Sequence, residues 1–263
     1  MSQHLSALFA DARTQRKALF VAYVTGGYPN QDQTADILLV MEAGGADVIE
    51  IGVPFSDPLA DGATIQHANH VAVSMGVSMR QCFDFVRQAR ERGLRAPVLL
   101  MGYYNPILAL GEERCVAEAK AAGADGFIVI DLPPEEAVSF LVACRANDMS
   151  FVPLVAPTTK DARIAKIAGV ADAFLYCVSV TGTTGGGNVA IDDLPAFLGR
   201  VRAQSDLPLA VGFGITTRAD VEAVGKIADA AVIGSAIIAA IDTAAGQSPA
   251  QRVREYVEDV SGR

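Results

Sequence analysis

Short apolar runs alternate with helical patterns along the whole chain. Each run has the length of a buried strand, and the stretches between runs carry apolar residues at helical spacing. A Gly or Ala ends several helical stretches a few residues before the next run, as at 43–47 and 121–125. This order predicts repeated βα units and a parallel sheet. The eight predicted strands lie near residues 18–24, 47–53, 97–101, 126–131, 151–155, 173–179, 208–212 and 230–234.

The number of strands distinguishes between two parallel architectures. Eight βα units in about 250 residues are typical of a closed (β/α)8 barrel, whereas an open doubly wound sheet usually has fewer strands for its length. Helical patterns near 2–13 and 248–260 lie outside the repeat, and no Pro-, Gly- or Ser-rich linker interrupts it. We therefore predict an α/β fold, a TIM barrel with an extra N-terminal helix, in one domain over residues 1–263.

One carboxylic acid breaks the apolar pattern of the second predicted strand. Side chains alternate across a strand, so Ile49 and Ile51 share one face while Glu50 points from the other into the space that the sheet encloses. Glu50 could be a structural residue that backbone donors or one Arg satisfy. The alternative is a carboxyl group kept for proton transfer, its pKa raised by desolvation. Asp61 could likewise be a turn residue before Gly62.

Further polar side chains lie at the carboxyl ends of the predicted strands, where barrels carry their active sites. None of the lysines lies at such an end, so an imine-forming amine is not expected. His67 and His70 lack a third ligand on the same unit, so no metal site is expected. Proton transfer by carboxyls and a tyrosine remains, which suits carbon–carbon cleavage or isomerisation. The strand-end residues are Asp57, Asp61, Tyr103, Asn105, Asp131 and Tyr176.

Glycine-rich segments close the seventh and eighth predicted strands, at 212–215 and 233–236. Ser235 follows the eighth strand near the start of a helix, where free N–H groups and the helix dipole attract anions. Barrels often bind phosphate at these two loops, although glycines also form ordinary tight turns. The glycine-rich segment 181–188 could act as a lid or be a disordered linker. We expect a phosphorylated ligand.

Composition narrows the class of partner and the compartment. The formal charge is −9 and there is no Lys/Arg-rich run, which argues against nucleic acid. No apolar run reaches membrane-spanning length, and the N-terminus lacks the features of a signal peptide, so a cytoplasmic protein without membrane contact is expected. The four scattered cysteines indicate reduced packing residues.

Residues 50–62, Glu-Ile-Gly-Val-Pro-Phe-Ser-Asp-Pro-Leu-Ala-Asp-Gly, resemble the signature of the tryptophan synthase alpha chain family, and the agreement continues through 64–66. Order and spacing hold across nearly the whole chain. The further matching segments are Asn105-Pro106, Asp131-Leu132-Pro133, Tyr176 with Ser179, Thr184-Gly185, Gly212-Phe213-Gly214 and Gly234-Ser235-Ala236.

The resemblance implies a lyase that splits indole-3-glycerol phosphate into indole and glyceraldehyde 3-phosphate. The indole ring is the electron sink once C3 is protonated, so the implied reaction needs no metal, imine or cofactor. By the same resemblance Glu50 is the acid/base, Asp61 accepts a hydrogen bond from the indole N–H, and Tyr176 positions Glu50 or the substrate. The implied substrate-binding residues are Gly185, Gly214, Gly234 and Ser235 for the phosphate, Thr184 in the lid, and Tyr23, Met101, Phe127 and Phe213 around the indole.

The resemblance also implies a partner. Family members pair with a pyridoxal-phosphate beta chain in an α2β2 assembly, and indole passes to that chain through a tunnel. Pyridoxal phosphate would belong to the beta chain, because it needs a strand-end Lys of its own. The residues that would face the partner are Pro54, Asp57, Asn105 and Pro133, with Asp57 and Thr184 coupling lid closure to it.

Two other functions stay open. A different phosphate-binding barrel, an isomerase or synthase, would be expected to need a Lys or Cys at a strand end, which this chain lacks. A non-catalytic subunit that binds a phosphorylated ligand and regulates a partner would be favoured by loss of Glu50 or Asp61, and both are present.

Overall fold

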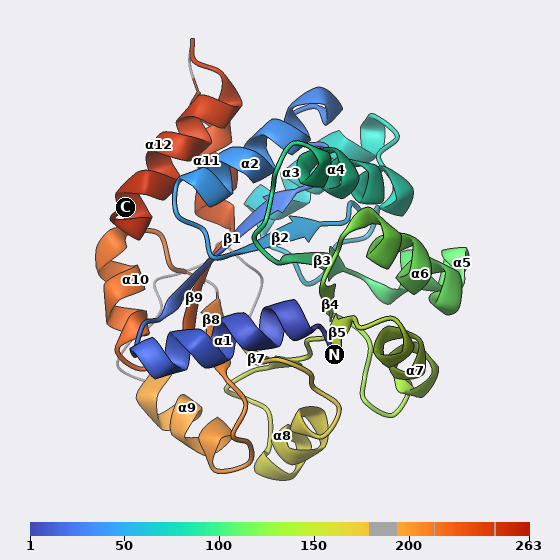
Figure 1. Cartoon of the computed structure of the whole chain (residues 1–263), viewed down its shortest axis with the longest axis vertical. Helices are drawn as coiled ribbons and strands as arrows, with labels where there is room; N and C mark the ends of the chain where they lie inside the picture. The colour runs from blue at the N-terminus through green and yellow to red at the C-terminus, as the bar shows by residue number, and fades with distance from the viewer. Residues whose placement is uncertain (179–193, 213, 245) are drawn as a thin grey trace.

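The computed structural model describes residues 1–178, 194–212, 214–244 and 246–263. In this part of the chain nine strand segments, all parallel, form one sheet in the order β5-β4-β3-β2-β1-β9-β8-β7-β6, which curls into a ring (Figure 1). The segments are β1 (Leu19–Thr25), β2 (Val48–Gly52), β3 (Val98–Gly102), β4 (Gly126–Val129), β5 (Ser150–Phe151), β6 (Leu154–Val155), β7 (Leu175–Val178), β8 (Leu209–Gly212) and β9 (Ala230–Ile233).

The fifth predicted strand is divided into two pieces. β5 pairs with β4 and β6 pairs with β7, with Val152 and Pro153 between them. Val152 N–H still donates to the Phe127 carbonyl at 2.9 Å, and Tyr176 N–H donates to the Pro153 carbonyl at 3.1 Å. Pro153 has no N–H, so it cannot continue the ladder as a donor. The chain itself joins β5 to β6 and closes the ring, so the fold is the predicted (β/α)8 barrel with its fifth strand in two pieces.

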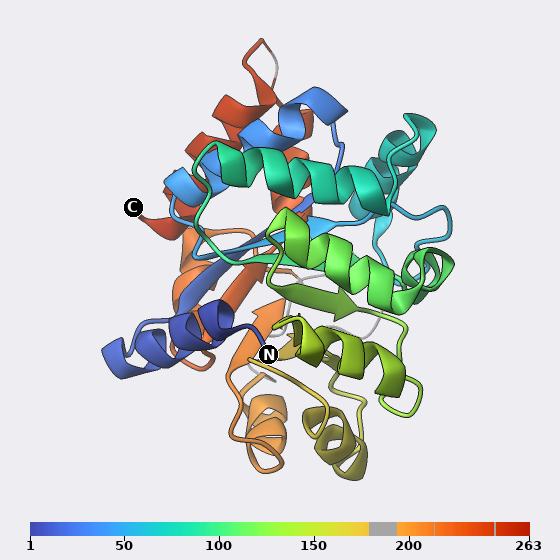
Figure 2. The same ribbon diagram turned by 45° about the vertical axis from the view of Figure 1, so that its right-hand side comes forward.

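Helices surround the sheet, as Figures 1 and 2 show. Their apolar faces pack on the outward side chains of the strands, such as Ile49 and Ile51, in the larger of two core clusters. Gly123 ends α6 with φ of 96°, as the glycine before the fourth strand predicts. The helices are α2 (Thr34–Ala43), α3 (Ala63–Ser74), α4 (Met79–Glu91), α5 (Tyr104–Leu110), α6 (Glu112–Ala122), α7 (Val138–Ala146), α8 (Asp161–Ala168), α9 (Leu194–Arg202), α10 (Arg218–Gly225), α11 (Ser235–Asp242) and α12 (Pro249–Ser261), with a 3-10 turn at Gln31–Gln33.

The extra N-terminal helix, α1 (Gln3–Gln15), closes one end of the barrel (Figure 1). Its apolar side belongs to the inner core cluster, where the Phe9 ring stacks on Phe174 at a centroid distance of 4.8 Å. This end lies at the amino ends of the strands. The barrel interior is therefore filled with side chains here, and space for a ligand is left at the opposite end.

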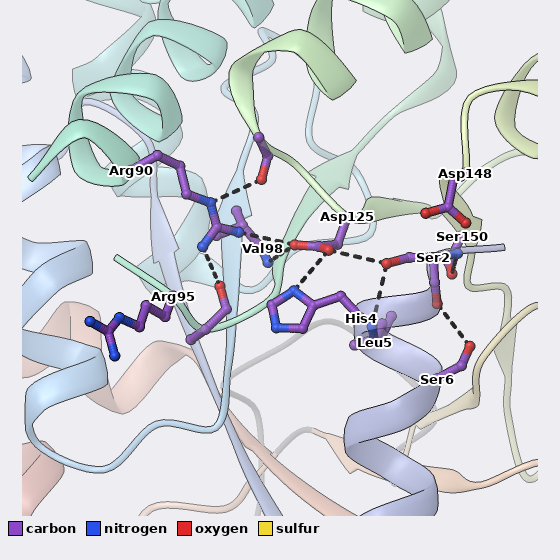
Figure 3. Close-up of polar contacts among 12 residues, drawn as sticks. Ser2, His4, Leu5, Ser6, Arg90, Arg95, Val98, Asp125, Asp148 and Ser150 are labelled. Atoms are coloured by element: carbon purple, nitrogen blue, oxygen red, sulfur yellow. Dashed lines mark hydrogen bonds and ion pairs between the residues drawn. The ribbon is translucent and has the colours of Figure 1, made fainter. Parts of the chain in front are cut away.

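Asp125 ties α1 to the barrel, as Figure 3 shows. Its carboxylate accepts hydrogen bonds from Ser2 Oγ at 3.1 Å and Arg90 Nη2 at 3.0 Å, and it lies 3.2 Å from His4 Nδ1. The Val98 N–H donates to the same carboxylate at 3.0 Å. One buried acid thus joins α1, α4 and the start of β3. No helix in the described ranges has the length and apolar character needed to cross a membrane.

Candidate active site

A cavity opens at the carboxyl ends of the strands. Eight of the predicted site residues line it, together with Ile65, Ile215 and Val232, which the sequence analysis missed. Val232 lies two residues before Gly234, so strand alternation could have placed it on the same face. The eight predicted residues in the wall are Tyr23, Glu50, Asp61, Met101, Tyr176, Gly214, Gly234 and Ser235.

Glu50 lies on the inner face of β2 and is fully buried. Its neighbours across the sheet are Tyr23 on β1 and Leu99 on β3. Neither carboxyl oxygen has a hydrogen-bond partner among the described residues, so the donors that a structural role would require are not found there. Burial raises the pKa of Glu50 to about 8. Glu50 is therefore mostly protonated at neutral pH and can act as an acid.

Asp61 follows β2 in the loop before α3, and its side chain lies in the same cavity. Burial raises the pKa of Asp61 to about 6, although a hydrogen bond from the Tyr103 hydroxyl to Oδ2 at 3.2 Å opposes the rise. Asp61 is therefore mostly ionised at neutral pH, whereas Glu50 is mostly neutral. Two carboxyls in one cavity with different protonation states are suited to different tasks.

Two tyrosines of the inner cluster lie over glycines of the neighbouring strands. A Cβ added to Gly52 would lie 2.1 Å from the Tyr23 hydroxyl, and one added to Gly212 would lie 2.4 Å from the Tyr176 hydroxyl. The Tyr23 hydroxyl lies 3.2 Å from Thr25 Oγ1. Burial raises the pKa of both phenols well above its ordinary value, so both are neutral hydrogen-bonding groups. Glycine at these strand ends allows the rings to form the wall of the cavity.

Replacing Gly52 by Ala is expected to lower the kcat/KM of the reaction that takes place in this cavity by about 10- to 100-fold. The Tyr23 ring must move, and small displacements of groups in an active site reduce rates strongly. The added methyl would also lie 2.6 Å from Cζ of that ring, so more than the hydroxyl must shift. Steady-state kinetics would measure the effect. Gly199→Ala is the matched control, since a methyl on this α9 glycine meets nothing within 4 Å. Equal activity of the two variants would show that the position of Tyr23 is unimportant.

The glycine-rich turns after β8 and β9 also line the cavity. Gly214 has φ of 78°, which favours glycine, and Gly234 and Ser235 begin α11. N–H groups in the first turn of a helix have no carbonyl of their own helix to bond, so this end can accept an anion. The predicted residues Thr184, Gly185 and Phe213 lie outside the described residues.

The expectation that Phe127 lines the cavity is wrong. Its ring belongs to the outer core cluster and packs edge-on against Phe140 of α7, with a centroid distance of 5.2 Å. Ile128, the next residue of β4, is the one that faces the barrel interior. Tyr103, which the sequence analysis noted only as a polar residue at a strand end, contacts Asp61 directly.

Burial of Glu50 links folding stability to pH. The pKa rises from 4.5 to about 8 on folding, so the unfolded chain loses this proton first. The stability contributed by the protonated native carboxyl is complete below the unfolded pKa and is lost as the pH rises through the folded pKa. Relative to Glu50→Gln, the unaltered chain should lose about 3 kcal/mol of unfolding free energy between about pH 5 and pH 8. Urea unfolding of both proteins at both pH values measures this, and parallel pH dependences would contradict it.

Known proteins are similar to this chain over nearly its whole length. The family model described as tryptophan synthase alpha chain matches residues 9–261. The chain is 45% identical over 258 residues to the tryptophan synthase alpha chain of Roseiflexus sp. (strain RS-1), covering 98% of this chain and 99% of that one. It is also 45% identical over 265 residues to tryptophan synthase of Saccharomyces cerevisiae (strain ATCC 204508 / S288c), covering 99% of this chain but 37% of the yeast protein.

A solved structure gives the same result. Tryptophan synthase subunit alpha from Legionella pneumophila str. Paris is similar with a TM-score of 0.91 at 33% identity, covering 100% of this chain and 98% of that chain. The sequence match, the shared fold and the coverage therefore point to one family. The chain belongs to the tryptophan synthase alpha chain family.

Proposed function

We propose that the chain is a lyase that cleaves indole-3-glycerol phosphate into indole and glyceraldehyde 3-phosphate. The observation that carries the proposal is the pairing in one cavity of a fully buried, mostly neutral Glu50 with a mostly ionised Asp61. A retro-aldol cleavage of this substrate needs one group that gives a proton to the ring and one that tolerates positive charge beside it. Family membership supports the same reaction.

The proposed reaction begins when Glu50 donates its proton to C3 of the indole ring. The ring becomes cationic, and Asp61 stabilises it by accepting a hydrogen bond from the ring N–H. Glu50, now a carboxylate, takes the proton of the side-chain hydroxyl next to the ring. The electron pair of that O–H bond forms the aldehyde, the carbon–carbon bond breaks, and its electrons restore the neutral indole. Protons and electrons balance within the substrate and Glu50, so the reaction takes no cofactor.

The remaining wall residues are assigned to binding. Gly214, Gly234 and Ser235 would hold the phosphate at the start of α11, and the proposal adds Gly185 to them. Tyr23 and Met101 would flank the indole, together with Ile65 and Val232. Phe213 is also proposed to flank the indole, and Thr184 is proposed to belong to the lid. Tyr176 is proposed to position Glu50 or the substrate, since its neutral phenol belongs to the same cavity wall.

The proposed partner is a tryptophan synthase beta chain, which carries the pyridoxal phosphate. Asp57 and Asn105 are exposed, as a role in the interface requires. Leu59, in the same loop as Asp57, is 83% exposed, and Leu108 on α5 is 57% exposed, so apolar side chains flank the proposed contact. Pro133 is partly buried. Pro54 is buried within this chain, so its part would be to shape the loop.

The proposed location is the cytoplasm. All four cysteines are buried and unpaired, and burial raises the pKa of each thiol, which is the state of packing residues in a reducing compartment.

The test is indole release from indole-3-glycerol phosphate by the purified chain, measured with and without a beta chain from the same source. Slow release that the beta chain accelerates is expected. No release under either condition, with a phosphate ligand still bound, would instead favour a non-catalytic regulatory subunit. Conversion of the substrate to a product other than indole would favour a different isomerase or synthase.

A further inference from the structure

Tyr103 lies directly after β3 and precedes the first residue of α5. Its side chain is buried, and its ring stacks on Phe55 with a centroid distance of 5.1 Å and an interplanar angle of 29°. Phe55 belongs to the loop between β2 and α3, which also carries Asp61. The ring of Tyr103 is therefore fixed against the loop whose carboxyl group it contacts.

The direction of the Tyr103 hydroxyl proton follows from its two partners. The backbone N–H of Ala60 can only donate, and it does so to the Tyr103 oxygen at 3.0 Å. The hydroxyl has one proton, and the other partner, Asp61 Oδ2, lies at 3.2 Å. The proton is thus aimed at Oδ2, which must be an unprotonated acceptor. A carboxyl that accepts at Oδ2 retains Oδ1 for a donor from the cavity.

Among the described residues, no other titratable side chain is a hydrogen-bonding cause of the Asp61 pKa. Glu50 on β2, Tyr23 on β1 and Tyr176 on β7 line the same cavity, and each is an acid whose ionised form would repel the Asp61 carboxylate. The charge of Asp131 acts on Tyr103, whose pKa it raises, and is not among the causes of the Asp61 pKa shift. In the described part of the chain, Tyr103 is the polar side chain that opposes the effect of burial on Asp61.

We propose that Tyr103 is a positioning residue that orients Asp61 and keeps it an acceptor for the indole N–H. The inference rests on the proposed function, because the donor it prepares for is that of the indole substrate. It also explains why the two buried carboxyls in one cavity differ in protonation state. Asp61 accepts a hydrogen bond from the Tyr103 hydroxyl, whereas Glu50 accepts none from the described residues. The same hydroxyl binds the loop backbone at Ala60, so loop position and Asp61 orientation are fixed together.

Tyr103→Phe tests the role, since it removes the hydroxyl and keeps the ring. We expect the acid limb of the kcat/KM profile to move upward by about one pKa unit, which is a tenfold change in the ratio of ionised to neutral Asp61. The loss of kcat should be about fivefold at about pH 6, where the ionised fraction of Asp61 falls from one half to about one tenth, and negligible at about pH 8, with KM little changed. Tyr104→Phe is the matched control, because its hydroxyl binds Glu112 at 2.6 Å, away from the cavity. It should leave the profile unchanged.

A second measurement does not depend on turnover. The 13C signal of the Asp61 carboxyl, assigned by its disappearance in Asp61→Asn, should titrate at higher pH in Tyr103→Phe than in the unaltered chain. An unshifted titration and an unshifted acid limb, beside normal indole release by the unaltered chain, would overturn the role of Tyr103 alone. Failure of the unaltered chain to release indole would instead overturn the proposed function.

Discussion

Replacing Glu50 by Gln is expected to reduce kcat for indole release by about 10²- to 10⁴-fold, the range that general acid–base catalysis contributes. The effect should lie near the upper end, because Glu50 both gives the proton to C3 and later takes the hydroxyl proton in the proposed reaction. A Gln amide has the size of the carboxyl but can do neither. Binding of the phosphorylated substrate should change little, since the proposed phosphate site is formed by other residues of the cavity, Gly234 and Ser235 among them.

The measurement is single-turnover indole release together with calorimetric titration of the substrate into the slow variant. Glu42→Gln provides a matched control. Glu42 Oε1 accepts hydrogen bonds from the backbone N–H groups of Arg95 and Ala96, which precede β3 at the closed end of the barrel. It should release indole at the normal rate. Turnover preserved in Glu50→Gln would remove Glu50 from the reaction.

Replacing Asp61 by Asn is expected to lower kcat by about 10²- to 10³-fold, as removal of one electrostatic stabiliser does in other sites. The Asn side chain can still occupy the space and can still accept from the Tyr103 hydroxyl. It lacks the negative charge that stabilises the protonated ring, and that charge matters more as the ring becomes cationic than in the bound substrate. The loss should therefore appear in kcat rather than in KM.

Separate determination of kcat and KM distinguishes these effects. Asp84→Asn is the control, since Asp84 lies exposed on α4 and pairs with Arg87. A rise in KM alone, with kcat preserved, would mean that Asp61 binds substrate and transition state equally and has no electrostatic part in the reaction.

Local sequence rules predicted that Glu50 points into the barrel, but they did not predict that Phe127 points outward. A single polar residue in the second strand marks one face, and strict alternation then assigns its neighbours. The fourth strand, Gly126–Val129, is apolar on both faces, so nothing within it identifies the face that points inward. That face is set by pairing with β3, where Met101 is opposite Ile128, and such register depends on residues far away in sequence.

The division of the fifth strand and the contact between Tyr103 and Asp61 were not predicted either, because both depend on residues that are far apart in the sequence. Pro153 could be read as a weak point in the ladder, but which neighbour each half joins depends on closure of the whole ring. Tyr103 contacts Asp61 only because the loop after β2 folds over the end of β3. Residues 42 apart in sequence meet there, and no spacing rule for helices or strands relates them.

The closing helix α1 has a consequence for synthesis of the protein. It is made before the residues that it contacts, which include Asp125, Ser150 and Phe174, and the bond from Ser2 to Ser150 spans 148 residues. The surface that the apolar side of α1 covers is therefore incomplete until Phe174 is made, when two thirds of the chain has been synthesised. Contacts of such large sequence separation form late in folding. Helix α1 therefore emerges long before it can dock completely, and its apolar side is open to chaperones in the meantime.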